Sequence, residues 1–458
     1  MATRAPRIVD VAAAGNALRA LAASDPERYP ILFESAAEGP LARFSLLATA
    51  PRAALWRDVS GALGASGFTP SPGGFLDNLE RWYRAEARPL TRPANLPFVG
   101  GWIVYAGYEL AAEIEPSLPL PPARMPLSAF ALRVDALAVH DLASGKVFAI
   151  AEEGDSPAHA RLIADLEAVG ANGTHGTVAP LPRATLREEL PEKYLERVRA
   201  AQRHIAAGDV YQANLSRPWR LTLNEPADPA RVYAALRTAN PAPFAASARF
   251  SGMTILSSSP ERLLRISGRE ISTRPIAGTR PRLGSPEADR RAIAELVAHP
   301  KERAEHVMLI DLERNDLGRV CEAGSVRVDE YMVTESYAHV HHIVSNVHGI
   351  LRADRSPVDA LRALFPGGTI TGCPKVRCMQ IIAELEGEGR GPYTGSLGWI
   401  GVDGDADFNI LIRTMTMDGQ EVELRAGAGI VADSDPEREL EETRAKALGM
   451  LRAFEWMT

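Results

Sequence analysis

The chain has 458 residues, of which 46% are hydrophobic and 24% are charged, and this composition indicates a globular protein with one large fold or two lobes. Its net charge of −7 gives no support for nucleic acid or an anionic membrane as a partner, and no run of about 18 apolar residues predicts a membrane span. Three cysteines are too few for a disulfide framework and fit a reducing, cytoplasmic location.

The N-terminal third reads as short strands and turns, followed by a helix. Period-two alternation and flanking turn residues predict strands over residues 31–35, 43–47, 98–105, 130–139 and 146–151. A helix is predicted over residues 157–169, and the Gly- and Pro-containing segment after it is the best linker candidate. We therefore expect an N-terminal lobe over residues 1–170, a linker over 171–189 and a second lobe over 190–458.

The second lobe alternates strands and helices without a regular βαβ rhythm. Pro191 opens a helix that ends at Gly208, and a strand follows over residues 210–215. Further strands are predicted over 253–257, 263–266, 398–402 and 408–417, and further helices over 288–313, 356–364, 374–386 and 436–455. This pattern favours the α+β class: a two-lobed, β-sandwich-like core of largely antiparallel sheets with helices packed outside.

Two Glu-x-x-Glu pairs are the first candidates for chemistry. Glu302 and Glu305 follow Pro300, and Glu439 and Glu442 follow Pro436. Proline suits the first position of a helix, and residues three apart share a helix face. If the two helices meet, four carboxylates converge, and oxygen ligands of this kind suit Mg²⁺ shared with a substrate anion. Either pair alone is more often a solvated helix face, so the prediction depends on neighbouring motifs.

Five motifs in the second lobe together resemble the chorismate-utilising enzymes. They are Ser258-Ser-Pro-Glu261, Arg274-Pro-Ile-Ala-Gly-Thr-Arg-Pro-Arg282, Asp311-Leu-Glu-Arg-Asn-Asp-Leu-Gly-Arg319, Gly367-Gly-Thr-Ile-Thr-Gly-Cys-Pro-Lys375 and Gly427-Ala-Gly-Ile-Val-Ala-Asp433. That family includes component I of anthranilate synthase, component I of aminodeoxychorismate synthase, and the isochorismate and salicylate synthases. The resemblance implies an anthranilate synthase component I-like fold, with a chorismate-binding catalytic domain over residues 190–458.

The resemblance also implies a set of ligand-binding residues. Glu305 and Glu442 would be the closest Mg²⁺ ligands, with Glu302 and Glu439 acting through water. Lys446 would neutralise a substrate carboxylate, although an ordinary i, i+4 ion pair with Glu442 is the alternative. The other substrate-binding positions implied are the carboxylate clamp Arg413 and Tyr393, the close-approach glycines Gly427 and Gly429, and the ring-bordering Thr369 and Thr371.

Catalytic roles follow from the same resemblance. Glu261 matches the general acid that protonates the departing hydroxyl, and His342 matches a histidine near the leaving group, with a structural hydrogen-bonding role as its alternative. Gln212 stands where isochorismate and salicylate synthases carry a water-activating lysine. Because an amide is no general base, ammonia is the expected nucleophile. The sequence contains no glutamine-hydrolysing motif, which predicts a glutamine amidotransferase partner subunit.

The positions that distinguish the two ammonia-using branches give conflicting indications in this sequence. Ala277 stands where aminodeoxychorismate synthases usually carry a lysine that attacks the ring, and anthranilate synthases have alanine there. Four other segments are similar to aminodeoxychorismate synthase: Tyr211-Gln-Ala-Asn-Leu-Ser216, Pro241-Ala-Pro-Phe244, His341-His342 and Ile370-Thr-Gly372. Because agreement across the chain outweighs one substitution, we favour the aminodeoxychorismate synthase branch, component I. It converts chorismate to 4-amino-4-deoxychorismate for p-aminobenzoate and folate.

Two alternatives remain open. The first is anthranilate synthase component I, in tryptophan biosynthesis, and the second is a catalytically silent scaffold for a glutaminase. Without the lysine, another nucleophile, ammonia or water, would have to add at ring C2. Finally, Glu34, Ser35, Pro243 and Phe244 fall where relatives bind tryptophan, and simple packing between the lobes is the alternative interpretation there.

Overall fold

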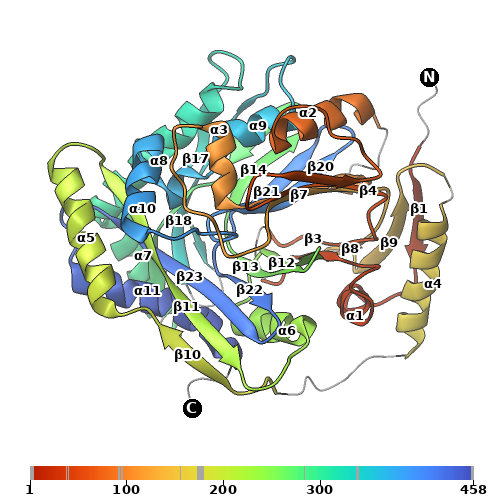
Figure 1. Ribbon diagram of the computed structural model, residues 1–458, viewed down its shortest axis with the longest axis horizontal. Coiled ribbons are helices and arrows are strands. Elements are labelled where there is room, and N and C mark those ends of the chain that lie inside the picture. The colour runs from red at the N-terminus through yellow and green to blue at the C-terminus, as the bar shows by residue number, and fades with distance from the viewer. Residues whose placement is uncertain are drawn as a thin grey trace.

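The computed structural model describes residues 5–37, 39, 41–90, 93, 96–154, 156–172, 180–282, 284–336 and 340–454. Within these residues the strands form two antiparallel sheets with helices packed on their outer sides (Figure 1). A hydrophobic core lies between the sheets, where Ile31 and Ile255 of one sheet pack with Phe130 and Leu397 of the other. The predicted α+β class, with largely antiparallel sheets and outer helices, is confirmed.

In space, the first sheet runs from the N-terminal strand at one edge to a strand from the middle of the sequence at the other edge. Its strands, in spatial order, are β1 (Arg7–Val11), β9 (Lys146–Ala151), β8 (Ala136–Asp141), β3 (Phe44–Ala48), β2 (Ile31–Glu34), β12 (Phe244–Phe250), β13 (Met253–Ser259), β22 (Thr414–Asp418), β23 (Glu421–Ile430), β11 (Gln212–Leu223) and β10 (Ala184–Glu188). The short strand β19 (Gly372–Cys373) also pairs with β11.

The second sheet also combines strands from the early and the late parts of the sequence. Its spatial order is β16 (Ile276–Pro281), β18 (Val340–Ile350), β15 (Glu270–Thr273), β14 (Arg262–Ser267), β21 (Ala406–Asn409), β20 (Ser396–Gly401), β6 (Gly101–Ala106), β7 (Leu127–Val134), β4 (Ala53–Asp58) and β5 (Leu63–Ser66). Strand β17 (Arg327–Ser336) pairs with β18 as well.

The helices are α1 (Ala17–Ser24), α2 (Phe75–Glu86), α3 (Ala111–Ile114), α4 (Pro157–Asn172), α5 (Pro191–Ala206), α6 (Pro229–Ala239), α7 (Pro286–Ala298), α8 (Pro300–Gly318), α9 (Pro357–Leu364), α10 (Lys375–Glu386) and α11 (Pro436–Leu451). Many begin at a proline, whose fixed φ and missing N–H suit the first helical position. No helix within the described ranges is long and apolar enough to cross a membrane.

Strands from residues 1–170 and from residues 190–458 share both sheets. Strand β2 pairs with β12, and β6 pairs with β20, so two pairings in two sheets join the predicted lobes. Residues 173–179 of the predicted linker lie outside the described residues, and residues 184–188 form β10. The division into two domains therefore stays a proposal about the sequence.

Three predicted elements are divided in the structure. The strand predicted over 130–139 becomes β7 and β8, which belong to different sheets. The helix predicted over 288–313 becomes α7 and α8, because Pro300 holds the preceding His299 in an extended conformation. The strand predicted over 408–417 is interrupted before β22 by Arg413, whose φ of 51° is left-handed.

Candidate active site

The predicted catalytic residues lie where β11 and β23 meet α8, α11 and the strand pair β16–β18. Strand β23 is hydrogen-bonded to β11 along its length, α11 packs on β23, and α8 packs on β16 and β18 (Figure 1). A short 3-10 turn over Gly368–Ile370 also contacts α8. Side chains from distant parts of the sequence are brought together here.

Glu261 is buried at the junction between β13 and β14. The Thr369 hydroxyl, on the 3-10 turn, donates a hydrogen bond of 2.8 Å to Glu261 Oε1. Burial raises the pKa of Glu261 to about 7, and the Thr369 hydroxyl, the Ile276 N–H and the positive charges of Arg413 and Lys446 oppose that rise. A large fraction of this carboxyl is therefore protonated at neutral pH, as a general acid requires.

His342 lies on β18 and is buried beside the same charges. Its Nδ1 is 3.4 Å from the carbonyl oxygen of Gly278, on the neighbouring strand β16. Burial, and then the positive charges of Arg413 and Lys446, lower the pKa of His342 to about 4. His342 is therefore a neutral imidazole at physiological pH, so it can accept a proton but cannot act as a general acid.

Arg413 differs from its predicted setting, because it lies just before β22 and not within a strand. Its backbone is left-handed, and its carbonyl oxygen accepts a hydrogen bond of 3.0 Å from the Ser258 N–H. The guanidinium forms no ion pair or hydrogen bond with the part of the chain that the structure describes. A strained residue that presents an unsatisfied cation beside Glu261 suggests a binding site for an anion.

Two glycines of β23 form the floor of this region. A Cβ on Gly429 would lie 2.2 Å from Gln212 Nε2, and a Cβ on Gly427 would lie 2.7 Å from the Tyr393 hydroxyl. Only a bare backbone leaves room for both neighbours. Burial raises the pKa of Tyr393 to about 12, so its hydroxyl remains a neutral hydrogen-bond donor.

The predicted metal ligands approach this floor from two helices. On α8, Glu305 Oε1 accepts a hydrogen bond of 3.1 Å from Gln212 Nε2, and it lies 3.6 Å from the Cβ position of Gly429. On α11, Glu442 pairs with Lys446 at 2.7 Å, and Lys446 Nζ also donates to the Gly427 carbonyl at 2.9 Å. The ion pair that was the alternative for Lys446 is thus present.

The second glutamate of each pair interacts with other groups. Glu302 pairs with Arg280 at 3.2 Å, and Glu439 is among the charges that raise the pKa of the Tyr194 hydroxyl. Among the described residues, no three His, Cys, Asp or Glu side chains gather closely enough to hold a metal ion. The four carboxylates are oxygen donors of the kind that Mg²⁺ prefers, so their chemistry fits this cation, although they do not converge on one point in this structure.

The remaining predicted residues have smaller roles in this arrangement. Thr371 is fully buried, and its hydroxyl donates to the Gly367 carbonyl at 2.9 Å, so it shapes the 3-10 turn. Ala277 is buried on β16 next to Gly278, whose φ is 62°, and contributes no nucleophile. Thr369, described above, is the turn residue whose hydroxyl reaches the acid Glu261.

Two buried charged residues were missed by the sequence reasoning. Arg390 pairs with Glu386 at 2.6 Å, donates to the Asn214 carbonyl at 2.6 Å and lies 5.5 Å from the Tyr393 ring centre, so it ties α10, β11 and Tyr393 together. Glu313 belongs to the motif over residues 311–319, to which the sequence analysis assigned no chemical role. Burial, then the Asp316 charge, raises its pKa to about 7. Its position within that motif was the available signal.

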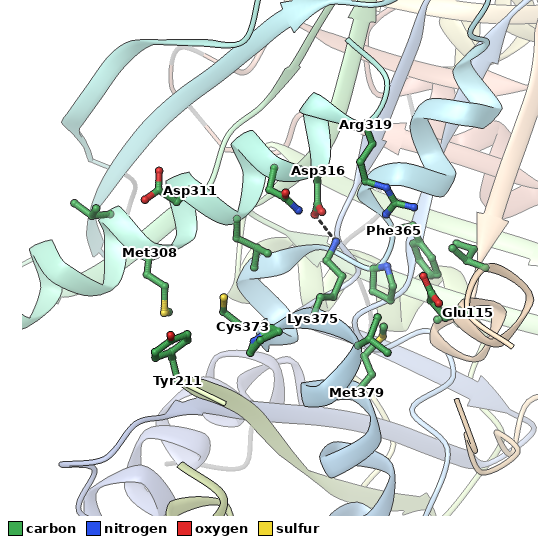
Figure 2. A pocket seen from close by; sticks show the side chains of 18 of the residues that line it. Glu115, Tyr211, Met308, Asp311, Asp316, Arg319, Phe365, Cys373, Lys375 and Met379 are labelled. Atoms are coloured by element: carbon green, nitrogen blue, oxygen red, sulfur yellow. Dashed lines mark hydrogen bonds and ion pairs between the residues drawn. The ribbon is translucent and has the colours of Figure 1, made fainter. Parts of the chain in front are cut away.

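A cavity of about 760 Å³ lies beside the site, between α8 and α10 (Figure 2). Tyr211, Met308 and Cys373 line it, and Lys375 forms a 2.5 Å ion pair with Asp316 at its wall. None of the predicted site residues lines this cavity.

A second cavity, of about 350 Å³, contains all four residues of the predicted tryptophan pocket. Glu34, Ser35, Pro243 and Phe244 line it together. Glu34 is already paired with Arg19 at 2.7 Å, and Ser35 donates to the Phe44 carbonyl at 3.1 Å. The structure thus joins these residues around one space, and its occupant stays a prediction.

Comparisons with known proteins agree with this geometry. Residues 64–452 match the family model described as chorismate binding enzyme, and the chain belongs to that family. It is 44% identical over 389 residues to anthranilate synthase component 1 of Streptomyces coelicolor, covering 79% of this chain and 74% of that one. It is also 47% identical over 287 residues to aminodeoxychorismate synthase component 1 of Bacillus subtilis, covering 60% of this chain and 61% of that one.

The fold has a solved counterpart. The crystal structure of anthranilate synthase component I from Streptococcus pneumoniae superposes with a TM-score of 0.79 at 32% identity, covering 90% of this chain and 93% of that chain. The anthranilate synthase component I-like fold expected from the motifs is therefore confirmed. The chain is a chorismate-utilising enzyme of the anthranilate or aminodeoxychorismate synthase type.

Proposed function

We propose that this chain catalyses the amination of chorismate by ammonia. The observation that carries the proposal is the placement of a carboxyl whose pKa is raised to about 7, Glu261, beside a guanidinium, Arg413, that has no partner among the described residues. Chorismate combines carboxylates with a hydroxyl that must leave. A fixed cation and a neutral acid meet those two needs at one place.

The residues of the site would divide the work as follows. Arg413 and the Tyr393 hydroxyl orient one carboxylate of chorismate, and Lys446 offers a second positive charge. Glu261 gives its proton to the departing hydroxyl, which leaves as water. Ammonia forms the new C–N bond, and the neutral imidazole of His342 or the newly formed Glu261 carboxylate takes the extra proton from nitrogen. Orientation by the fixed cations would supply much of the rate.

Glu302, Glu305, Glu439 and Glu442 are the residues that would hold Mg²⁺. The cation would neutralise the ring carboxylate of chorismate and so favour attack on the ring. Lys446 would then exchange its pairing with Glu442 for the substrate.

The first candidate product is anthranilate. Direct attack of ammonia at C2 needs no lysine, and Ala277 provides none; Lys375 is committed to Asp316. Loss of the enolpyruvyl group as pyruvate would then complete the aromatic ring. Relatives such as the Streptomyces coelicolor protein are named anthranilate synthase component 1, which supports this choice. It reverses the preference drawn from scattered motifs.

The second candidate product is 4-amino-4-deoxychorismate. It is supported by the 47% identity to the Bacillus subtilis protein and by the segment Ile370-Thr-Gly372. For either product, the component 1 names of the relatives support a second subunit, a glutamine amidotransferase, as the source of ammonia.

One assay tests the proposal and separates the candidates. Purified protein is incubated with chorismate, Mg²⁺ and ammonium at alkaline pH. Fluorescent anthranilate supports the first candidate, whereas p-aminobenzoate that appears only after a lyase is added supports the second. If chorismate is not consumed by the folded protein, amination is refuted and the silent scaffold becomes the better account.

A further inference from the structure

Two side-chain amides on β11 have oxygens that accept no hydrogen bond from the described residues. Gln212 and Asn214 are two residues apart, so their side chains lie on the same face of the strand. The oxygens Gln212 Oε1 and Asn214 Oδ1 are both inaccessible to solvent, and neither accepts a hydrogen bond from the part of the chain that the structure describes. Gln212 as a whole is only 3% exposed. Buried acceptors without donors are unfavourable and rare in native proteins, so two together point to a missing donor.

Glu305 determines which way the Gln212 amide faces. The distance from Gln212 Nε2 to Glu305 Oε1 is 3.1 Å. A carboxylate accepts hydrogen bonds and does not donate them, so the NH₂ group of the amide must face Glu305. The amide oxygen therefore points away from the carboxylate and remains an acceptor in need of an N–H or O–H group.

Asn214 presents its oxygen over the same floor of glycines. A Cβ on Gly427 would lie 3.0 Å from Asn214 Oδ1 and 2.7 Å from the Tyr393 hydroxyl, and a Cβ on Gly429 would lie 2.2 Å from Gln212 Nε2. The space that these two glycines leave is thus bordered by both amides and by the proposed carboxylate-binding tyrosine. A ligand bound to the amides would adjoin chorismate.

The chemistry of two amide oxygens suits ammonia. Ammonia has three N–H donors and one lone pair, so two N–H···O bonds hold the molecule and leave the lone pair available for attack. An amide oxygen does not take a proton at neutral pH, so it leaves ammonia uncharged and nucleophilic. Water could also donate two hydrogen bonds, but it would need a general base to attack, and an amide is none.

We propose that Gln212 Oε1 and Asn214 Oδ1 together bind the ammonia molecule that attacks chorismate. This assignment rests on the proposed amination. In the step that leads to the first candidate product, a bond forms between the ammonia nitrogen and ring C2, and the C–O bond to the 4-hydroxyl breaks. The hydroxyl leaves as water with the proton of Glu261. One proton of the new ammonio group then returns to the Glu261 carboxylate, so charge and atoms balance.

The test measures initial rates against ammonium concentration, with saturating chorismate and Mg²⁺ and without any amidotransferase. Asn214→Ala and the similarly sized Asn214→Leu should raise KM for ammonium about tenfold, the effect of losing one hydrogen bond. KM for chorismate should change by less than about twofold, because its carboxylates are bound elsewhere. The matched control is Asn224→Ala, which removes an exposed asparagine just beyond the far end of β11 and should change neither constant.

A second variant separates binding from a structural role. Asn214→Asp keeps the size and an acceptor oxygen but adds a negative charge, which favours ammonium over ammonia. Its KM for ammonium should stay low while kcat falls, a split that a folding defect would not produce. If Asn214→Ala and Asn214→Leu do not fold, this variant decides the question.

Two outcomes would overturn the assignment. One is an unchanged KM for ammonium in Asn214→Ala and Asn214→Leu, and the other is an equal rise in KM for both substrates. Failure of the proposed function is recognised separately, because the wild-type protein would then produce no amine from ammonium before any variant is examined.

Discussion

Replacing Glu261 with glutamine removes its charge and nearly preserves its shape, including the oxygen that accepts from Thr369. The ordinary pKa of this carboxyl is 4.5, and burial raises it to about 7 in the folded chain. This gap corresponds to about 3 kcal/mol, since each unit of pKa is worth about 1.4 kcal/mol. Between these two pH values the unfolded chain has released the proton and the folded chain still holds it. The folded state therefore loses stability as the pH rises from 4.5 to about 7.

Glu261→Gln cannot ionise and so avoids this loss. We expect its free energy of unfolding to exceed that of the wild type by up to about 3 kcal/mol at pH 8, and the difference to vanish at pH 4.5 and below. Denaturant unfolding of both proteins across this range measures the difference, with the exposed Glu225→Gln as a control that should follow the wild type. The same variant should lose about 10²–10⁴ in kcat, because the general acid is gone.

The result that would refute this reasoning concerns stability alone. If Glu261→Gln showed the same pH dependence of unfolding as the wild type, Glu261 would not be held protonated by burial. Its assignment as the acid would then lose its physical basis, whatever the activity of the variant. A loss of activity without the gain at pH 8 would indicate a binding role instead.

Three further predictions address the floor, the cation and the second cavity. Gly429→Ala places a methyl group on Gln212 Nε2 and should lower activity at least about 100-fold and stability by about 1–3 kcal/mol in thermal unfolding; the control Gly318→Ala meets open space and should change neither. Arg413→Lys should raise KM for chorismate at least about tenfold with a smaller effect on kcat, because an ammonium cannot reproduce the guanidinium fork; equal losses in both constants would contradict a binding role. Isothermal titration should detect tryptophan in the wild type and none in Ser35→Leu, which fills the second cavity; binding retained by the variant would place tryptophan elsewhere.

Short motifs in the sequence identify residues that the structure brings close to one another. Pro436 starts α11 as predicted, since a proline at the first turn is a local signal, and Pro300, in the middle of the helix predicted over 288–313, starts α8 for the same reason. Glu261 and Thr369, which belong to two different motifs, lie within hydrogen-bonding distance of each other in the structure.

Other features depend on contacts that a linear pattern does not contain. The left-handed backbone of Arg413 interrupts a stretch whose alternation reads as one strand. The chain passes from β7 in one sheet to β8 in the other, although its hydrophobic run is continuous. Arg390 was missed because its partners come from helix, strand and loop segments that are distant from one another in the sequence.

The order of strands in the first sheet has a consequence for synthesis on the ribosome. Strands β11 and β13 are complete by residue 259, but β22 and β23, which fill the gap between them, are not translated until residues 414–430. The nascent polypeptide therefore carries two unpaired strand edges while more than a third of the message is still being read. Such edges are templates for association with other chains. Shielding by a chaperone during translation would matter more for this protein than for one whose neighbouring strands are consecutive.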